Sequence, residues 1–190
     1  MIVTTLAGPA AEPVGLAEAR DYLRIAATAE DGLVAHLIAA ARSRIEEATG
    51  VAMITRSLRV TLDWWPRGTV DRRWLRLPAR PAGALNAVRV FDRHGAAQVV
   101  TERFTLPAGR QAKLLWTDGA FPWPGQRLGG IEIDYDAGFG EAPEDVADSL
   151  RLAVKRLVAN AYAARDPETL AGALPVDVAG LIAPWRRVRL

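Results

Sequence analysis

The chain has no cysteine, two histidines and only two lysines among 190 residues. The absence of cysteine excludes disulfide bonds, thiolate metal ligands and a cysteine nucleophile, and it is compatible with a reducing compartment. The two histidines, His36 and His94, are far apart in the sequence and form no HExxH pattern. We therefore expect no metal and no cofactor.

Long apolar runs are also missing. No segment reaches the roughly 18 consecutive apolar residues of a transmembrane helix, and residues 1–9 lack a basic leader. The composition, 50% hydrophobic and 24% charged, is typical of a globular protein with one core or one core and a small lobe. We expect a soluble, non-exported protein with no membrane partner.

The charge of the chain is small in total but unevenly distributed. The net charge is −3 over residues 1–50, +8 over 51–127, −6 over 128–185 and +3 over 186–190, which gives +2 for the whole chain. Almost all basic residues are arginines, which fits either a GC-rich genome or selection for the planar donor fork of arginine. Oppositely charged segments offer complementary surfaces to protein neighbours.

The N-terminal part has helical periodicity. Residues 16–24 predict a short helix, because their apolar side chains fall on one face. A second helix is expected to begin at Thr28, whose hydroxyl can cap the amide of Asp31, and to end at Gly50. Its apolar positions follow the 3.6-residue period, which makes it the clearest element of the chain.

The C-terminal part also predicts a long helix. Pro143 suits the first helical position, and the helix should stop before Pro167. Residues 167–190 have the pattern of an irregular, extended arm. Within that arm, Trp185 and Leu190 bracket three arginines in a segment too short to fold alone, so it either extends into solvent or docks on a partner.

The middle of the chain alternates apolar and polar residues, which is typical of strands with one face exposed to water. Turn residues separate these strands, and no helix lies between them, so we expect an antiparallel sheet or a small barrel-like sandwich. The predicted strands are residues 57–63, 74–77, 87–91, 98–101, 104–106, 113–116 and 131–135. The predicted class is α+β, with a helical core from 1–50 and 138–166, an inserted β domain over 51–137 and a C-terminal arm over 167–190.

Few residues have a pattern that indicates catalysis. Glu132, Asp134 and Asp136 share one face of a predicted strand, where they either bind a divalent cation or, as we favour, form a solvated face. The segment 138–140 has two glycines before a helix but lacks the rest of a phosphate-binding loop. Ser57 and Ser149 have no nearby His and Asp pattern. We expect no catalytic residue and no enzyme.

The arginines of the middle segment suggest a second possibility, a DNA-binding accessory protein without sequence preference. Arginine contacts phosphates and aromatic rings stack on bases, but the same residues are equally expected on the wet face and in the core of a sheet. No helix-turn-helix, zinc finger or RNA-binding motif is present. The residues concerned are Arg59, Arg72, Arg73, Arg76, Arg89 and Arg93, with Trp64, Trp65, Trp74 and Phe91.

The order of the segments resembles the head-to-tail connector, or adaptor, proteins of tailed phages, of the siphophage, prophage or gene transfer agent type. The resemblance spans most of the chain. It rests on Leu16–Arg24, Glu30–Leu33, Ile38–Ala41, Ile45–Gly50, Leu75–Pro78 with Pro81, Ile131–Gly140, Pro143 followed by Leu150, Ala153, Leu157, Val158 and Tyr162, and the closing Leu181–Leu190. The long β insertion between Gly50 and Gly138 departs from the smallest, mostly helical members.

The resemblance implies a structural protein of the neck of a phage-like particle, assembled in the bacterial cytoplasm. Such adaptors form a ring, commonly twelvefold, that joins the portal protein to the stopper or tail-completion protein, and DNA passes through the lumen without sequence-specific recognition. The helical part builds the ring body and the C-terminal segment reaches the portal. Carried onto this sequence, the candidate portal-binding residues are Pro184, Trp185, Arg186, Arg187, Val188, Arg189 and Leu190.

Overall fold

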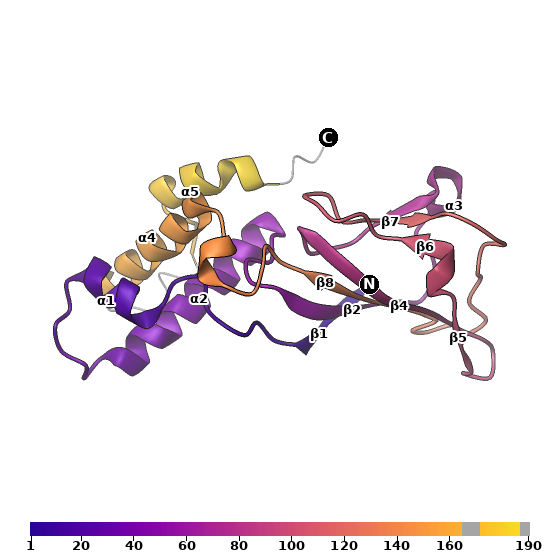
Figure 1. Ribbon diagram of the computed structural model, residues 1–190, viewed down its shortest axis with the longest axis horizontal. Helices are drawn as coiled ribbons and strands as arrows, with labels where there is room; N and C mark the ends of the chain where they lie inside the picture. The colour runs from indigo at the N-terminus through magenta and orange to yellow at the C-terminus, as the bar shows by residue number, and fades with distance from the viewer. Residues whose placement is uncertain (165–171, 187–190) are drawn as a thin grey trace. The chain divides into compact units, whose positions relative to one another are not determined.

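The computed structural model describes residues 1–164 and 172–186, and the chain divides into two compact units (Figure 1). The sheet unit comprises Met1–Gly8 and Thr55–Gly138, and the helical unit comprises Pro9–Ile54 and Phe139–Leu190. The chain therefore passes between the units three times, after Gly8, Ile54 and Gly138.

The helical unit packs its helices around one apolar core. The helices are α1 (Leu16–Leu23), α2 (Asp31–Thr49), α4 (Asp148–Ala164) and α5 (Val176–Ile182), with 3₁₀ turns η2 (Pro143–Asp145) and η4 (Ala183–Trp185). Buried residues recur every three to four positions along these helices, because that spacing keeps their side chains on one side of a helix. In α2 they include Val34, Ile38, Ala41 and Ile45. Within the described residues, no helix has the length and apolar character required to cross a bilayer.

Two helices begin later than the sequence predicts. The helix expected at Thr28 begins at Asp31, whose amide donates to the backbone carbonyl of Thr28 (3.1 Å) and not to its hydroxyl. The helix expected at Pro143 begins at Asp148, because residues 143–145 form a 3₁₀ turn closed by a hydrogen bond from the amide of Ala142 to the carboxylate of Asp145 (3.0 Å). The predicted end of α2 is confirmed, since Gly50 has φ of +67°.

The sheet unit contains two antiparallel sheets. The larger sheet has the order β1-β2-β8-β4-β5, and the smaller has the order β3-β7-β6. The strands are β1 (Ile2–Ala7), β2 (Arg56–Leu62), β3 (Trp74–Arg76), β4 (Ala82–Phe91), β5 (Ala97–Val99), β6 (Phe104–Thr105), β7 (Lys113–Trp116) and β8 (Ile131–Ala137), with α3 (Thr69–Arg72) and the 3₁₀ turn η1 (Thr101–Arg103) between them. The predicted strands are confirmed, and the two sheets do not close into a barrel.

The core of the sheet unit lies on one face of the larger sheet. Leu58, Val60 and Leu62 of β2 alternate with exposed or half-exposed residues, as a two-residue period requires. Tyr135 of β8 is fully buried, and its hydroxyl accepts a hydrogen bond from the amide of Ala79 (3.0 Å). The opposite face is polar, and it carries the charged residues described below.

The predicted α+β class is confirmed, but two segments differ from the predicted organisation of the chain. Ile2–Ala7 were expected with the helices, but they pair with β2 as an edge strand whose six residues are all exposed, so no buried alternation marks them in the sequence. Residues 167–190 were expected as an irregular arm, but Val176–Ile182 form α5. Its Val178 and Ile182 are fully buried in the helical core.

Candidate interaction surfaces

The polar face of the larger sheet carries a network of arginines and carboxylates. Arg59 on β2 lies opposite Asp134 on β8 and donates from Nε and Nη2 to its two carboxylate oxygens at 2.7 and 2.8 Å. Arg89 on β4 donates to the same carboxylate at 2.6 Å. Glu132 joins the network at 3.3 Å from Arg59 and 3.8 Å from Arg89. Two cations and two anions therefore balance each other on three adjacent strands.

This network explains the carboxylate triplet of β8. Hydrogen bonds from Arg59 lower the pKa of Asp134 most strongly, burial opposes them, and Arg89 lowers it further. Asp136 accepts hydrogen bonds from Ser57 (2.5 Å) and Asn86 (3.0 Å). In the part of the chain that the structure describes, no group of three or more His, Asp or Glu side chains is placed to hold a metal ion. The triplet is a salt-bridged face, neither the cation site nor the simple solvated face considered from the sequence.

The histidines and serines considered in the sequence contact backbone groups or other polar side chains. His36 lies exposed on α2 with Nδ1 2.7 Å from the carbonyl oxygen of Gly32, and His94 lies in the exposed β4–β5 hairpin beside Arg93. Ser149 accepts a hydrogen bond from the indole of Trp185 at 3.0 Å. Ser57 donates to Asp136, and Ser149 accepts from Trp185, so the structure does not bring these serines and histidines together into a triad.

The glycines at 138 and 140 are explained by backbone geometry. Gly138 has φ of +150°, and a β-carbon on Gly140 would overlap the carboxylate of Asp145. That carboxylate is held in place by the amide of Ala142. These glycines allow a tight turn beside a capping carboxylate, and the pair is not arranged as a phosphate cradle.

Three cations of the sheet unit lie around a tryptophan of the smaller sheet. The ring of Trp74 on β3 lies 4.8 Å from Nζ of Lys113, 5.8 Å from the guanidinium of Arg76 and 6.0 Å from that of Arg72. Arg73 covers the ring of Trp116 on β7 at 4.3 Å. Cations within about 6 Å of an indole centroid are attracted by the negative ring face. We call Arg67, Arg72, Trp74, Arg76 and Lys113 the basic cluster.

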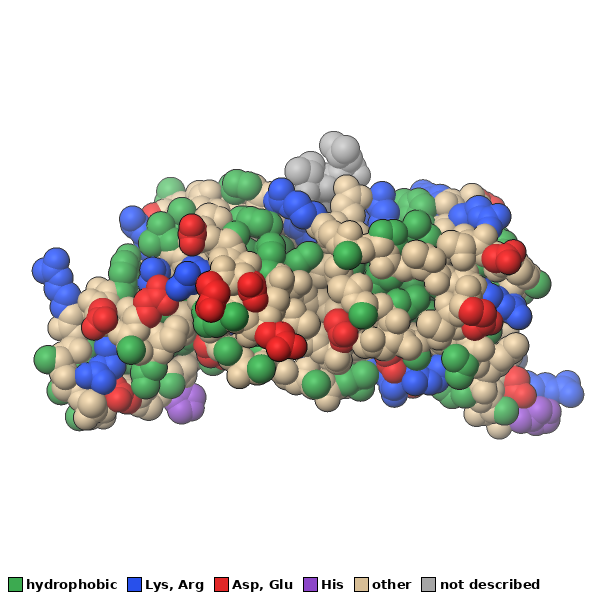
Figure 2. Space-filling view, viewed as in Figure 1, with side chains coloured by type: hydrophobic (Ala, Val, Ile, Leu, Met, Phe, Trp, Pro, Cys, Tyr) green, Lys and Arg blue, Asp and Glu red, His purple; other side chains and the backbone are tan. Residues whose placement is uncertain are grey.

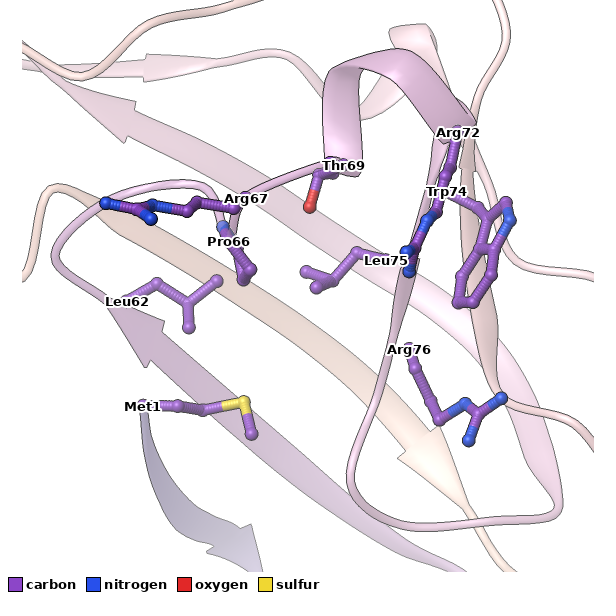
Figure 3. Close-up of a pocket in the computed structure, with 10 residues that line it drawn as sticks. Met1, Leu62, Pro66, Arg67, Thr69, Arg72, Trp74, Leu75 and Arg76 are labelled. Carbon is purple, nitrogen blue, oxygen red and sulfur yellow. The ribbon is translucent and has the colours of Figure 1, made fainter. Parts of the chain in front are cut away.

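The basic cluster borders a cavity of about 430 Å³. Figure 3 shows Leu62, Pro66 and Leu75 on one side of it, and Arg72, Trp74 and Arg76 on the other. A second cavity of about 510 Å³ shares Pro66, Arg67 and Gly68 with the first. Its lining includes Trp64 and Trp123, which are 52% and 55% exposed and have ring centroids 5.7 Å apart.

The aromatic residues of the middle segment therefore divide into two groups. Trp65 is buried, stacks with Phe104 at 5.5 Å and donates from its indole to the carbonyl of Pro122. Trp64 and Trp74 remain accessible at the two cavities. Among the six arginines named with them, Arg59 and Arg89 are engaged with Asp134, whereas Arg72 and Arg76 belong to the basic cluster.

The described part of the C-terminal segment is anchored to the helical core. The ring of Trp185 is half-buried and lies edge-on to Phe139, with centroids 5.5 Å apart. Pro184 and Arg186 are exposed on either side of it. Arg187, Val188, Arg189 and Leu190 lie outside the described residues.

The chain is similar to proteins of gene transfer agent (GTA) particles along its whole length. A chain from the neck of an empty GTA particle computed with C6 symmetry is 30% identical, with a TM-score of 0.84, and the match covers 100% of this chain and 97% of that one. The chain belongs to the neck proteins of gene transfer agents. A chain of the native GTA virion, also 30% identical, has a TM-score of 0.82 with the same coverage.

A third similar structure is a chain from the neck of a native GTA particle computed with C12 symmetry. It is 28% identical to this neck protein over 100% of this chain and 97% of that chain, with a TM-score of 0.77. No protein-family model and no curated protein matches.

Sequence reasoning missed two members of the basic cluster in this neck protein. Arg67 was not among the arginines considered for DNA contact, and Lys113 lies about 40 residues from the other cluster residues. Lys113 reaches Trp74 because β7 pairs with β3 in register, with Lys113 opposite Arg76. The sequence signals for this site were the charge total of +8 over residues 51–127 and the arginines and tryptophans named there, which include Arg72, Arg76 and Trp74.

Proposed function

We propose that this neck protein is a head-to-tail adaptor, a ring-forming subunit that joins the portal to the stopper or tail of a GTA-like particle and surrounds its DNA channel. The observation that carries the proposal is the similarity to GTA neck chains over the whole length of both proteins, at 30% identity. The C6 and C12 symmetry of the neck structures supports a ring, commonly twelvefold in the family suggested by the sequence. As a structural protein, it needs no catalytic residue.

We assign the ring body to the helical unit, as the sequence resemblance implies. We assign additional contacts between neighbouring subunits to the sheet unit. A closed ring requires a heterologous interface, in which two different surfaces of one subunit contact its two neighbours. The opposed charges of the segments, +8 over residues 51–127 and −6 over 128–185, support such an interface.

The portal contact is assigned to Pro184–Leu190. Arg186 is exposed immediately after the anchored Trp185, so the tail begins at a fixed point on the helical core. Arginine beside apolar residues is typical of protein interfaces, where the guanidinium pairs with carboxylates and its stem packs on apolar surface.

Electron microscopy of the purified neck protein together with the portal of its particle tests the proposal. The expected result is a ring stacked on the portal ring. A variant that lacks residues 187–190 should keep its fold, because Trp185 remains, and should lose the portal. A wild-type protein that stays monomeric with the portal present would refute the adaptor function.

The alternative is an accessory protein that binds DNA without sequence preference. Such a protein would bind duplex DNA as a free monomer, with an affinity that falls steeply with salt. Two of its six proposed arginines, Arg59 and Arg89, are engaged with Asp134 and Glu132 on the sheet face. Electrophoretic shift of a duplex at two salt concentrations separates this alternative from the adaptor, which should bind little DNA alone.

A further inference from the structure

The basic cluster contains four cations of the sheet unit. Within the described residues, Arg67, Arg72, Arg76 and Lys113 form no ion pair, although other arginines of the sheet unit do. Three of these cations converge on the single ring of Trp74. Like charges brought together repel each other, so an external anion would lower the electrostatic energy of this surface.

The cavity beside the cluster favours an anion that also carries apolar groups. Buried Leu62 and Leu75 line it together with the exposed Arg67, Arg72 and Arg76 (Figure 3). The phosphate groups of a duplex have no apolar atoms to pack against these leucines. A turn of a protein chain can supply both carboxylates and apolar side chains. The basic cluster, for its part, contains Trp and Arg, the residues that are enriched in the hot spots of protein interfaces.

The chain itself has a segment of this chemistry in its helical unit. Residues 141–148 carry four carboxylates around Pro143, and Glu141, Glu144 and Asp148 are exposed. Within the described residues, none of these three forms an ion pair with a cation of its own chain, whereas Asp145 caps the turn. Figure 2 shows several acidic side chains on the helical part of the surface. We call residues 141–148 the acidic turn.

We propose that the basic cluster of one copy binds the acidic turn of a neighbouring copy. The proposal rests on the proposed ring-forming function, and it names the two surfaces that would meet. The basic cluster and the acidic turn lie on different units of the chain and have opposite charge, so each copy offers one to each neighbour. A contact of this kind is heterologous and propagates from subunit to subunit, as ring closure requires.

Two charge-reversal variants test the contact. The first variant changes Arg67, Arg72 and Arg76 to Glu and takes the cluster from a charge of +4 to −2. The second changes Glu141, Glu144 and Asp148 to Arg and takes the turn from −4 to +2. Each alone should weaken self-association at least about tenfold, because every interface would oppose like charges. A matched control changes Arg93, Arg110 and Arg127 to Glu, which makes the same charge change at exposed arginines outside the cluster, and it should assemble like the wild type.

Mixing the two variants in equal amounts gives the decisive result. In an alternating assembly each interface is either wild type or reversed on both sides, so the mixture should regain rings that neither variant forms. Mass photometry and negative-stain images, with the portal added where it is needed, report the assemblies, and thermal melts confirm that each variant folds.

Three outcomes would overturn the proposal. Cluster-reversed protein that assembles like the wild type, or a mixture that fails to recover, would show that the two surfaces do not meet, while wild-type rings would still support the adaptor function. Binding of duplex or oligothymidine by the wild type that is lost only in the cluster variant, with assembly unchanged, would assign the cluster to nucleic acid. Absence of wild-type rings in every condition would instead remove the adaptor function on which the proposal rests.

Discussion

Arg59 and Asp134 lie directly opposite each other on β2 and β8, and the guanidinium donates hydrogen bonds to both carboxylate oxygens, at 2.7 and 2.8 Å. Asp134 is almost fully buried, and Arg89 closes the group from the third strand at 2.6 Å. One carboxylate thereby links β2, β8 and β4 through their side chains as well as their backbones. Charge-assisted, two-point contacts of this kind are the stronger class of hydrogen bond.

Replacing Asp134 with Asn should reduce the free energy of unfolding at pH 7 by about 2 kcal/mol, because two arginines lose their charged acceptor. The pKa of Asp134 is lowered in the folded protein, chiefly by Arg59, so its stabilising contribution is complete above the ordinary Asp pKa of about 3.9. It is lost as the pH falls below that value, because the unfolded chain takes up the proton first.

Urea unfolding of wild type and variant from pH 7 to pH 2 measures this effect. The two free energies should converge as the pH falls. Glu132→Gln is the control, since Glu132 is more exposed and stands at 3.3 and 3.8 Å from the same arginines, so it should cost less. Equal losses for the two variants would contradict the central role of Asp134.

Trp185→Ala should destabilise the protein by about 2 kcal/mol, before any portal is present, because the half-buried indole packs on Phe139 and donates to Ser149. Removing residues 184–190 therefore tests fold and binding together. Arg186→Ala is the control, since its side chain is exposed and should leave the melting temperature unchanged. A Trp185→Ala protein as stable as the wild type would show that the indole is free to serve a partner.

Gly140→Ala should lower stability by about 1–3 kcal/mol, because the new methyl group overlaps the carboxylate of Asp145 and forces it from the amide of Ala142. Gly32→Ala provides the comparison. A β-carbon at Gly32 meets nothing within 4 Å and lies in α2, where alanine is favoured by about 1 kcal/mol. Thermal melts should move in opposite directions for the two variants, and a shared direction would contradict the account of Gly140.

Glu18→Gln should weaken the contact between α1 and α4 by about 1 kcal/mol. Burial raises the pKa of Glu18, but hydrogen bonds from Lys155 and Arg151, at 3.0 and 2.9 Å, outweigh it and lower the pKa. Glu47→Gln is a suitable control, because Glu47 is 75% exposed and, among the residues that the structure describes, pairs with Arg44 of its own helix. Hydrogen exchange of the α1 amides should accelerate in the first variant and not in the second.

Local patterns in the sequence were sufficient to predict most elements. The alternation in residues 57–63 and 131–135 predicts β2 and β8, because their neighbours in the chain reveal which face is buried. β1 has no such signal, since all six of its residues are exposed. α5 was missed because its seven residues follow a stretch with turn-like composition, and its burial depends on contacts with α4.

The interaction surfaces were less predictable, because they depend on sheet order. Arg59 and Asp134 are 75 residues apart, and only the β2-β8-β4 order brings Arg59 and Arg89 to the same carboxylate. The sequence assigned these arginines and carboxylates to separate possibilities, DNA contact and cation binding, and the fold combines them into one network. Trp185 was expected to extend or dock elsewhere, and its contact with Phe139 again spans a long sequence separation.

The three crossings of the chain between its units determine how it can be dissected. A fragment of residues 55–138 would contain seven of the eight strands but would leave β2 as an unprotected edge, because β1 is supplied by residues 2–7. A fragment of the helices would need two pieces that are separated by the whole of that insert. During synthesis, neither unit can fold completely until late. β2 cannot pair with β8 before residue 131 has left the ribosome, and the helical core is incomplete until α4 has been made. The two units of this neck protein are therefore expected to be completed late in translation, the sheet unit shortly before the helical unit. A stop codon before β8 should leave neither of them intact, and one between Gly138 and α4 should leave only the sheet unit complete.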